Sequence, residues 1–381
     1  MKHLLLFVIL SILLTACGAQ NAEPANLIPD TETLDTPLPA EINAPLIESP
    51  SLVKIYFLNE RDGWGVTETQ IVRTNDGGIT WYNVTPPEVT ETGYSVDWFV
   101  LDNTHVWLQQ PDFENYPNSG FQFRTTDGGI NWSKTAVPFS SAKIQFLTAN
   151  NGWALADLGV GAGSNAVAVY QTNDGGASWN LKYINDPNHA SAAESLPLGG
   201  LKYGLTPLDM QIAWIYGVVY APGTPYLFRT DDSGATWTPV TLPLPQGAEN
   251  SELTIEQIKF TSSTNGFMAM RSTSEEIKLA VYVSTDAGNT WSLTPTLIPG
   301  GSADFLSANE MIIYNREQFY VTRDAARTWS IVPPDILFGD IFSSMDFVNT
   351  SSGYVITQDP TNHRSLYRTS DGGATWFPVI P

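Results

Sequence analysis

Short runs of apolar residues fill the chain after about residue 50, and polar turns separate them. The clearest runs are Val53 to Leu58, Ile144 to Leu147, Ile258 to Phe260 and Met345 to Val348. Each is short enough for a β-strand and ends in a turn rich in Asn, Asp, Ser or Gly. A second strand then opens with glycine and an aromatic residue, as in Gly63-Trp64 and Gly353-Tyr354. The pattern predicts many short antiparallel strands.

One motif recurs seven times with fixed internal spacing: a Thr or Ser stands two residues before an Asp, and a Trp follows the Asp by five. Successive motif tryptophans are 38 to 58 residues apart. The Asp and Trp pairs are Asp76 and Trp81, Asp127 and Trp132, Asp174 and Trp179, Asp232 and Trp237, Asp286 and Trp291, Asp324 and Trp329, and Asp371 and Trp376. A period of this length is typical of solenoids and propellers.

The repeat predicts an all-β fold, a seven-bladed β-propeller over residues 51–381, because four short strands cannot bury both faces alone. Each blade has four antiparallel strands, with the motif between the third and fourth. We expect the motif Asp to accept backbone N–H bonds from its own turn and the glycine two residues later to adopt a positive φ. In the sixth copy Ala326 replaces that glycine.

The motif resembles the Asp-box (BNR) repeat, and its pairing with an upstream Gly-Trp strand resembles the photosystem II assembly and stability-factor-like propellers. That group also includes exported proteins without a photosynthetic role. Sialidases, xyloglucan hydrolases and sortilin-type receptors carry Asp boxes too, so the resemblance implies an architecture and not an activity. The seven Asp and Trp pairs are therefore interpreted as structural.

The N-terminus predicts an exported, lipid-anchored protein. An apolar run of 11 residues, Leu4 to Leu14, has the length of a signal-peptide core. Leu14-Thr15-Ala16-Cys17 resembles the bacterial lipoprotein box, and Cys17 is the single cysteine. The resemblance implies diacylglycerol on Cys17 and cleavage before it, so residues 1–17 are interpreted as a signal peptide. An ordinary secretory signal is the alternative. The location expected is a bacterial cell envelope, at the outer face of the cytoplasmic membrane or at the outer membrane.

Residues 18–50 contain six prolines, six carboxylates and no Lys or Arg. This composition predicts a disordered acidic tether between the anchor and the propeller.

The chain has 39 acidic and 18 basic residues, a formal charge of −21. A nucleic-acid partner is excluded because phosphate binding needs a basic surface. Four histidines, spread along the chain, give no metal motif. We expect neither a metal nor a cofactor, although calcium among the loop carboxylates stays open.

The binding surface is expected on the propeller face opposite the Asp boxes. That face carries the connections between second and third strands and between blades, which are long and irregular here. The candidate binding residues are Asp112, Phe113, Glu114, Tyr116, Tyr220, Tyr226, Arg271, Arg316 and Arg364. Their acidic and aromatic character predicts an exported or membrane protein with a basic segment as partner, with a glycan as a second ligand class, bound by a monomeric propeller.

No catalytic residue is assigned. Arg271, Arg316 and Arg364 lie in loops of consecutive blades, as an arginine cluster of sialidase type would, but the Arg-Ile-Pro-like motif of sialidases is missing. A carboxylate pair of a glycoside hydrolase cannot be located among so many acidic residues. The sequence therefore favours a non-catalytic binding scaffold, with a glycoside hydrolase (sialidase-like or glucan-active) or a carbohydrate-binding propeller as the alternative.

Overall fold

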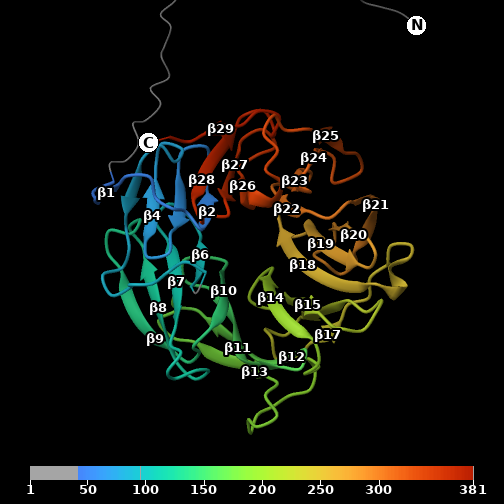
Figure 1. The fold of residues 1–381 in the computed structure, drawn as a ribbon. Helices are drawn as coiled ribbons and strands as arrows, with labels where there is room; N and C mark the ends of the chain where they lie inside the picture. Colours follow the sequence, from blue (N-terminus) through green and yellow to red (C-terminus); the bar gives the residue numbers. More distant parts are fainter. Residues whose placement is uncertain (1–41, 95, 381) are drawn as a thin grey trace, which may run out of the picture. The chain divides into compact units, whose positions relative to one another are not determined.

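The computed structural model describes residues 42–94 and 96–380 (Figure 1). The predicted signal peptide and most of the predicted tether lie outside these residues. The described part of the tether belongs to the folded domain: Ile42 is 7% exposed, and β1 (Leu46–Ile47) pairs antiparallel with β5 (Trp81–Asn83). The domain thus begins before the expected boundary at residue 51.

Four-stranded repeats follow β1 along the described chain. Repeat 1 has β2 (Lys54–Phe57), β3 (Gly63–Val66), β4 (Ile71–Thr74) and β5; repeat 2 has β6 (Asp97–Val100), β7 (Val106–Pro111), β8 (Gly120–Thr125) and β9 (Ser133–Val137); repeat 3 has β10 (Ala142–Phe146), β11 (Gly152–Gly161), β12 (Ser164–Thr172) and β13 (Asn180–Ile184); repeat 4 has β14 (Leu201–Pro207), β15 (Ala213–Val218), β16 (Tyr226–Thr230) and β17 (Thr238–Pro239). Repeat 5 has β18 (Glu252–Phe260), β19 (Gly266–Thr273), β20 (Ile277–Ser284) and β21 (Ser292–Ile298); repeat 6 has β22 (Ser302–Phe305), β23 (Met311–Tyr314), β24 (Phe319–Thr322) and β25 (Ser330–Val332); repeat 7 has β26 (Phe342–Phe347), β27 (Gly353–Gln358), β28 (Arg364–Thr369) and β29 (Phe377–Pro378). Two 3-10 helices, η1 (Ala248–Asn250) and η2 (Gly339–Ile341), precede β18 and β26.

The repeats are arranged as a ring with their first strands at the centre (Figure 1). First strands of neighbouring repeats contact one another at five junctions: β6 with β10, β10 with β14, β14 with β18, β22 with β26, and β26 with β2. Consecutive strands within a repeat pair antiparallel. The predicted all-β propeller of four-stranded antiparallel units is therefore confirmed. In the described residues the units form six sheets, because repeats 4 and 5 share one sheet through the pair Val218↔Thr254.

The hydrophobic core is divided among neighbouring repeats. Each core cluster joins two of them: Trp64 of repeat 1 packs with Val106 of repeat 2, and Trp107 of repeat 2 packs with Ile144 of repeat 3. Trp64, Trp107, Trp153 and Trp214 are 0% exposed. Each repeat therefore buries its apolar face only when the next repeat is present.

The glycine of the Gly-aromatic pairs has a packing role. A Cβ on Gly63 would lie 2.6 Å from the Phe57 ring, and one on Gly353 would lie 2.2 Å from the Phe347 ring. A ring from the first strand thus lies flat on the glycine of the second. A larger residue there would displace the aromatic core.

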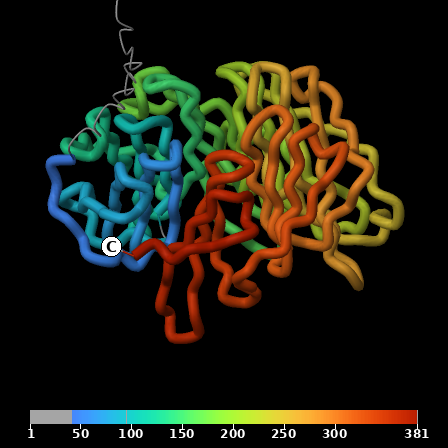
Figure 2. The backbone as a smooth tube through the Cα atoms, turned by 90° about the horizontal axis from the view of Figure 1, so that it is seen from above, coloured from blue at the N-terminus to red at the C-terminus, as the bar shows by residue number. Residues whose placement is uncertain are grey.

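The two ends of the described chain meet without exchanging a strand (Figure 2). Repeat 1 is built from residues 54–83 and repeat 7 from residues 342–378. Between them the rings of Phe57 and Tyr354 stack with centroids 3.6 Å apart, and the Tyr354 hydroxyl donates to the Glu60 carbonyl. Side-chain packing therefore closes the ring.

Each Asp box is held by a closed set of hydrogen bonds. In the first box, Thr74 Oγ1 donates to Asp76 Oδ1 over 2.9 Å and accepts the N–H of Gly78. Asp76 accepts both the N–H and the hydroxyl of Thr80. Equivalent bonds occur in the other six boxes. The aspartates thus hold their own turns, and the hydroxyl residue two positions earlier is an equal part of each turn.

The box turn contains two residues of positive φ. Gly77 and Gly78 have φ of 77° and 86°, whereas the sixth box holds Ala325 at 59° and Ala326 at 62°. The expectation for the second position is confirmed. The positive φ of the first position, directly after the Asp, was not predicted from the sequence.

Every box turn is tied to the short loop between the first and second strands. The N–H of Gly77 donates to the Arg61 carbonyl, and that of Gly128 donates to the Thr104 carbonyl. The other five repeats have the same bond. We call this side of the ring the Asp-box face. The opposite side, with the second-to-third and inter-repeat connections, is the loop face.

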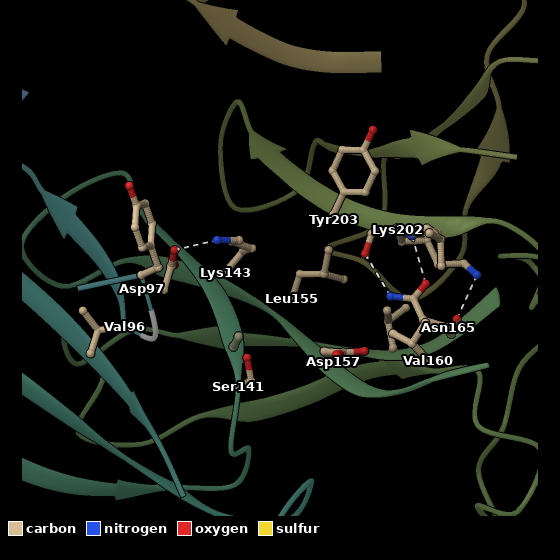
Figure 3. A pocket seen from close by; sticks show the side chains of 14 residues that line it. Val96, Asp97, Ser141, Lys143, Leu155, Asp157, Val160, Asn165, Lys202 and Tyr203 are labelled. Carbon is tan, nitrogen blue, oxygen red and sulfur yellow. Dashed lines mark hydrogen bonds and ion pairs between the residues drawn. The ribbon is translucent and has the colours of Figure 1, made fainter. Parts of the chain in front are cut away.

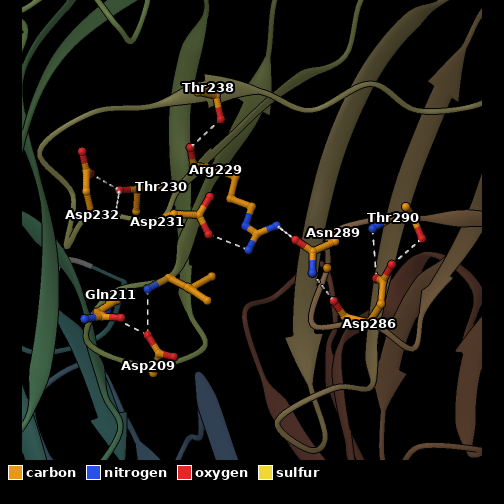
Figure 4. A network of polar contacts seen from close by, with 12 residues as sticks. Asp209, Gln211, Arg229, Thr230, Asp231, Asp232, Thr238, Asp286, Asn289 and Thr290 are labelled. Atoms are coloured by element: carbon orange, nitrogen blue, oxygen red, sulfur yellow. Dashed lines mark hydrogen bonds and ion pairs between the residues drawn. The ribbon is translucent and has the colours of Figure 1, made fainter.

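Arginines before the box threonine link neighbouring repeats. The Arg73, Arg124 and Arg229 guanidinium carbons lie 5.4–5.5 Å from the centroids of tryptophan rings, within the range of a cation–π contact. Figure 4 shows Arg229 reaching Asp231 in its own repeat and Asn289 in the next box. These arginines are structural.

Candidate functional site

A pocket of about 320 Å³ opens on the loop face between repeats 2, 3 and 4 (Figure 3). Its lining is Tyr94, Val96, Asp97, Ser141, Ala142, Lys143, Leu155, Asp157, Val160, Asn165, Val167, Leu201, Lys202 and Tyr203. We call it the inter-repeat pocket. It lies where β6, β10 and β14 begin and where β11 and β12 form their hairpin.

One side of the inter-repeat pocket is an ion pair across two repeats. Lys143 Nζ lies 2.9 Å from Asp97 Oδ1, and Asp97 Oδ2 accepts the N–H of Ile144 over 2.9 Å. The carboxylate is thus oriented by the backbone of β10. It fixes the lysine at the edge of the pocket.

The other side is built around a buried lysine. Lys202 is 2% exposed, and its ammonium donates to the carbonyls of Asn165, Leu198 and Gly200 over 2.7–3.0 Å. The Asn165 amide pairs with both the N–H and the carbonyl of Lys202. Burial lowers the pKa of Lys202 to about 8. This cation holds repeat 3 against repeat 4 and is not displayed to a ligand.

Several predicted binding residues lie beside this pocket. Phe113 and Tyr220 are 73% and 60% exposed, and the Tyr116 hydroxyl donates to Asp157 over 3.3 Å. The Asp112 carboxylate accepts the N–H groups of Glu114 and Asn115 and so shapes the loop. Glu114 itself is exposed.

Tyr226 is a correction to the predicted set. It is 3% exposed, its hydroxyl donates to the Pro197 carbonyl, and the Lys202 ammonium lies 5.2 Å from its ring centroid. Tyr226 is part of the core beneath the pocket because β16 turns its side chain inward.

The three arginines predicted to lie in loops each have a different carboxylate partner. Only Arg316 lies in a loop, because Arg271 is part of β19 and Arg364 is the first residue of β28. Arg271 pairs with Glu256, Arg364 with Glu68 over 2.9 Å, and Arg316 with Asp340 over 3.8 Å. Arg364 links repeat 7 to repeat 1, and its side chain is 8% exposed. None of the three is among the residues that line the axial cavities described below.

Two cavities of about 470 and 370 Å³ lie along the axis of the ring. They share Tyr56, Gln257 and Lys259, and the second also contains Asp304 and Asp346. Burial raises the pKa of both carboxyls, and the neighbouring Asp304 charge adds to the effect on Asp346. No sequence spacing indicates this pair, because the two residues lie in different repeats.

No group of three or more His, Cys, Asp or Glu side chains suited to a metal ion occurs in residues 42–94 and 96–380. Within the same part of the chain, no helix has the length and apolar character needed to span a bilayer.

Comparison with known proteins agrees with the repeat geometry. The model of the BNR/Asp-box repeat matches residues 123–134, the second box. The fold is thus an all-β propeller whose turns are similar to the Asp-box repeat.

The propeller is similar in sequence to the photosystem II assembly lipoprotein Ycf48 of Synechococcus sp. (strain CC9902). The two are 26% identical over 183 residues, which is 46% of this chain and 47% of Ycf48. The propeller thus spans about half the length of that relative.

Among solved structures, it is similar to YCF48 bound to a D1 peptide, with a TM-score of 0.52, 17% identity, and coverage of 85% of this chain and 96% of that one. It is also similar to the GH74 xyloglucanase from Xanthomonas campestris, with a TM-score of 0.56, 11% identity, and coverage of 86% and 54%. Both similarities show the fold alone.

Proposed function

We propose that this propeller is a non-catalytic scaffold that binds an exported or membrane protein through its loop face. The observation that carries the proposal is the inter-repeat pocket, an open cavity bordered by exposed aromatic side chains on the face predicted for binding. The similarity to Ycf48, solved with a D1 peptide, supports a peptide or protein as the ligand. The excess of carboxylates favours a partner with a basic segment.

The scaffold is proposed to be a monomer, tethered to a bacterial envelope membrane by lipid on Cys17. The lipoprotein-box sequence before Cys17 supports this anchor. Two or three acyl chains give durable attachment, whereas one gives reversible attachment. The residues between Cys17 and the folded domain would act as a tether that holds the propeller away from the lipid surface.

A photocrosslinking experiment tests the assignment of faces. Benzoylphenylalanine is placed at Tyr203, which is 39% exposed on the loop face, or at Ile130, which is 56% exposed in the second Asp box. Full-length chains are irradiated in the cells that produce them. We expect a discrete crosslinked protein from position 203 and none from position 130. A crosslink from position 130 alone would overturn the proposal.

A glycoside hydrolase is the second candidate, and Asp304 and Asp346 favour it. Burial raises the pKa of Asp346, as the general acid of such an enzyme requires, and a second carboxyl group, that of Asp304, lines the same axial cavity. Each carboxylate also accepts a backbone N–H from the next repeat, which gives it a structural role. Turnover of xyloglucan or sialosides that is lost in both Asp304→Asn and Asp346→Asn would support this alternative over the scaffold.

A further inference from the structure

Exposed apolar side chains gather around the inter-repeat pocket. Tyr94, Val160 and Tyr203 line it and are 63%, 65% and 39% exposed. Leu198, 42% exposed, lies on the segment whose carbonyls hold Lys202. The ring of Tyr220 lies so close to Gly163, at the tip of the β11–β12 hairpin, that a Cβ there would come within 2.9 Å of it. Apolar side chains that stay exposed around a pocket mark a surface that contacts another molecule.

The charges of the pocket are unequally satisfied. Lys143 is paired with Asp97, and the Lys202 ammonium is enclosed by backbone carbonyls. The Asp157 carboxylate, in contrast, accepts two long bonds of 3.3 Å, one from the Tyr116 hydroxyl and one from the Gly159 N–H. Charged acceptors usually hold their donors at about 2.7–2.9 Å. Asp157 therefore retains the capacity to accept a cationic donor.

The size of the pocket limits what it can take. Its volume of about 320 Å³ is near the lower end of the roughly 300–1,000 Å³ that ligand pockets span. This is room for one or two side chains. The apolar walls formed by Leu155, Val160 and Val167 suit an apolar side chain better than a sugar ring with its hydroxyls.

We propose that the inter-repeat pocket takes an aromatic or aliphatic side chain from a partner peptide, while a Lys or Arg close to it in that peptide pairs with Asp157. This inference rests on the proposed function and names the chemistry of its ligand. Exposed Glu114, in the loop beside the pocket, adds negative charge that would steer such a peptide. Tyr203 and Tyr94 provide rigid aromatic contacts around the anchor.

Selection from a phage-displayed library of random 12-residue peptides on the full-length chain tests the inference. We expect enriched sequences with an aromatic or aliphatic residue within two positions of Lys or Arg. A synthetic peptide of that sequence should bind at least tenfold more weakly to Asp157→Lys. Val160 stands exposed at the hairpin end, so Val160→Asp tests the apolar contact in a folded protein, and we expect at least a fivefold loss. The matched control is Ile130→Asp on the Asp-box face, which should bind as the native chain does.

The outcomes separate this inference from the proposed function. In one outcome, the selected peptides bind Asp157→Lys and Val160→Asp as they bind the native chain but fail to bind Glu114→Lys. That result would overturn the inter-repeat pocket as the peptide site and leave the loop face as the binding surface. Peptide binding that is lost only in Ile130→Asp would overturn both the pocket inference and the proposed function. Enrichment of no peptide, together with binding of the chain to an oligosaccharide array, would also overturn both.

Discussion

The carboxylate of Asp346, in the last repeat, accepts the backbone N–H of Phe57, in the first, across 289 residues of sequence. Asp304 accepts the Phe347 N–H over 2.7 Å in the same way, and Asp97 accepts that of Ile144. At these three junctions, side-chain carboxylates connect first strands that do not pair through their backbones. Asp346 does this at the junction between the two chain ends.

Asp346 should make the stability of the ring depend on pH. Burial raises the pKa of Asp346 to about 8, whereas an unfolded aspartate has a pKa near 3.9. The folded state therefore holds a proton that the unfolded state releases, and this stabilisation is complete below pH 4 and is lost as the pH rises through 8. Asp346→Asn keeps an oxygen that can accept the Phe57 N–H. We expect its free energy of unfolding, relative to the native chain, to rise by at least about 1 kcal/mol between pH 5 and pH 8 in denaturant titrations.

The control for this prediction is Asp97→Asn. It changes a carboxylate with the same backbone role but also breaks the ion pair with Lys143, whose ammonium is exposed. We expect a loss of at most about 1 kcal/mol at both pH values. An identical pH response of Asp346→Asn and the native chain would contradict the argument.

The sixth Asp box offers a stabilising substitution at Ala325. An alanine at positive φ costs about 1–2 kcal/mol, more than the ~0.4–1 kcal/mol that glycine costs through its freer unfolded chain. Ala325 is only partly buried, so Ala325→Gly should raise the free energy of unfolding by about 0.5–1 kcal/mol. Ala326 is 0% exposed, and the loss of its buried methyl group, about 0.8 kcal/mol, should leave Ala326→Gly near neutral.

Gly372→Ala in the seventh box is the matched reverse change. Gly372 has φ of 78°, and a Cβ there would lie 2.8 Å from the Thr350 carbonyl oxygen. We expect it to lower the melting temperature. Greater stabilisation from Ala326→Gly than from Ala325→Gly would contradict the positive φ assigned to Ala325.

The parts of the fold that repeat were predictable, and the parts that differ between repeats were not. The Asp-box motif occurs seven times, so its spacing predicted both the turn and the ring. The reason for Gly63 was hidden, because a sequence does not show that the Phe57 ring lies on it. Repeats 4 and 5 belong to one sheet because of a single residue pair, Val218↔Thr254, and this pairing has no sequence signature.

The site was predicted as a face but not as a pocket. Its polar residues come from three repeats, and Lys143 and Lys202 were not among the predicted binding residues because the acidic composition favoured carboxylates. A signal was present: Lys54, Asp97, Lys143 and Lys202 all stand at or next to the first residue of consecutive inner strands. Tyr226 was misplaced for the opposite reason, since its inward orientation depends on the register of β16.

Binding of a basic peptide should weaken with salt. At about 0.5 M NaCl the screening length falls well below the ~8 Å of physiological ionic strength, which reduces attraction to the exposed carboxylates. Glu114→Lys should raise the dissociation constant several-fold at low salt and flatten its salt dependence in fluorescence anisotropy titrations. The charge is reversed at Glu114 and not at Asp112, because the Asp112 carboxylate also holds the loop through its hydrogen bonds. Glu32→Lys, in the segment before the propeller, should have no effect, and equal affinity at low and high salt would contradict the electrostatic part of the account.

Cys17 should carry the lipid anchor. If its thiol is the acylated group, Cys17→Ser leaves an unprocessed precursor that takes up no labelled fatty acid, because serine offers no thiol. The measurement is metabolic labelling followed by electrophoresis, with the native chain as the positive control. Equal labelling of both chains would remove the lipoprotein interpretation.

The central claim is that the loop face, and not the Asp-box face, receives the partner. Hydrogen–deuterium exchange of the full chain, with and without a saturating selected peptide, tests it most directly. The account predicts slower exchange of amides in residues 96–97, 141–143, 157–165 and 198–203, and unchanged exchange in the seven box turns. Protection of the box turns with no change around the inter-repeat pocket would contradict it.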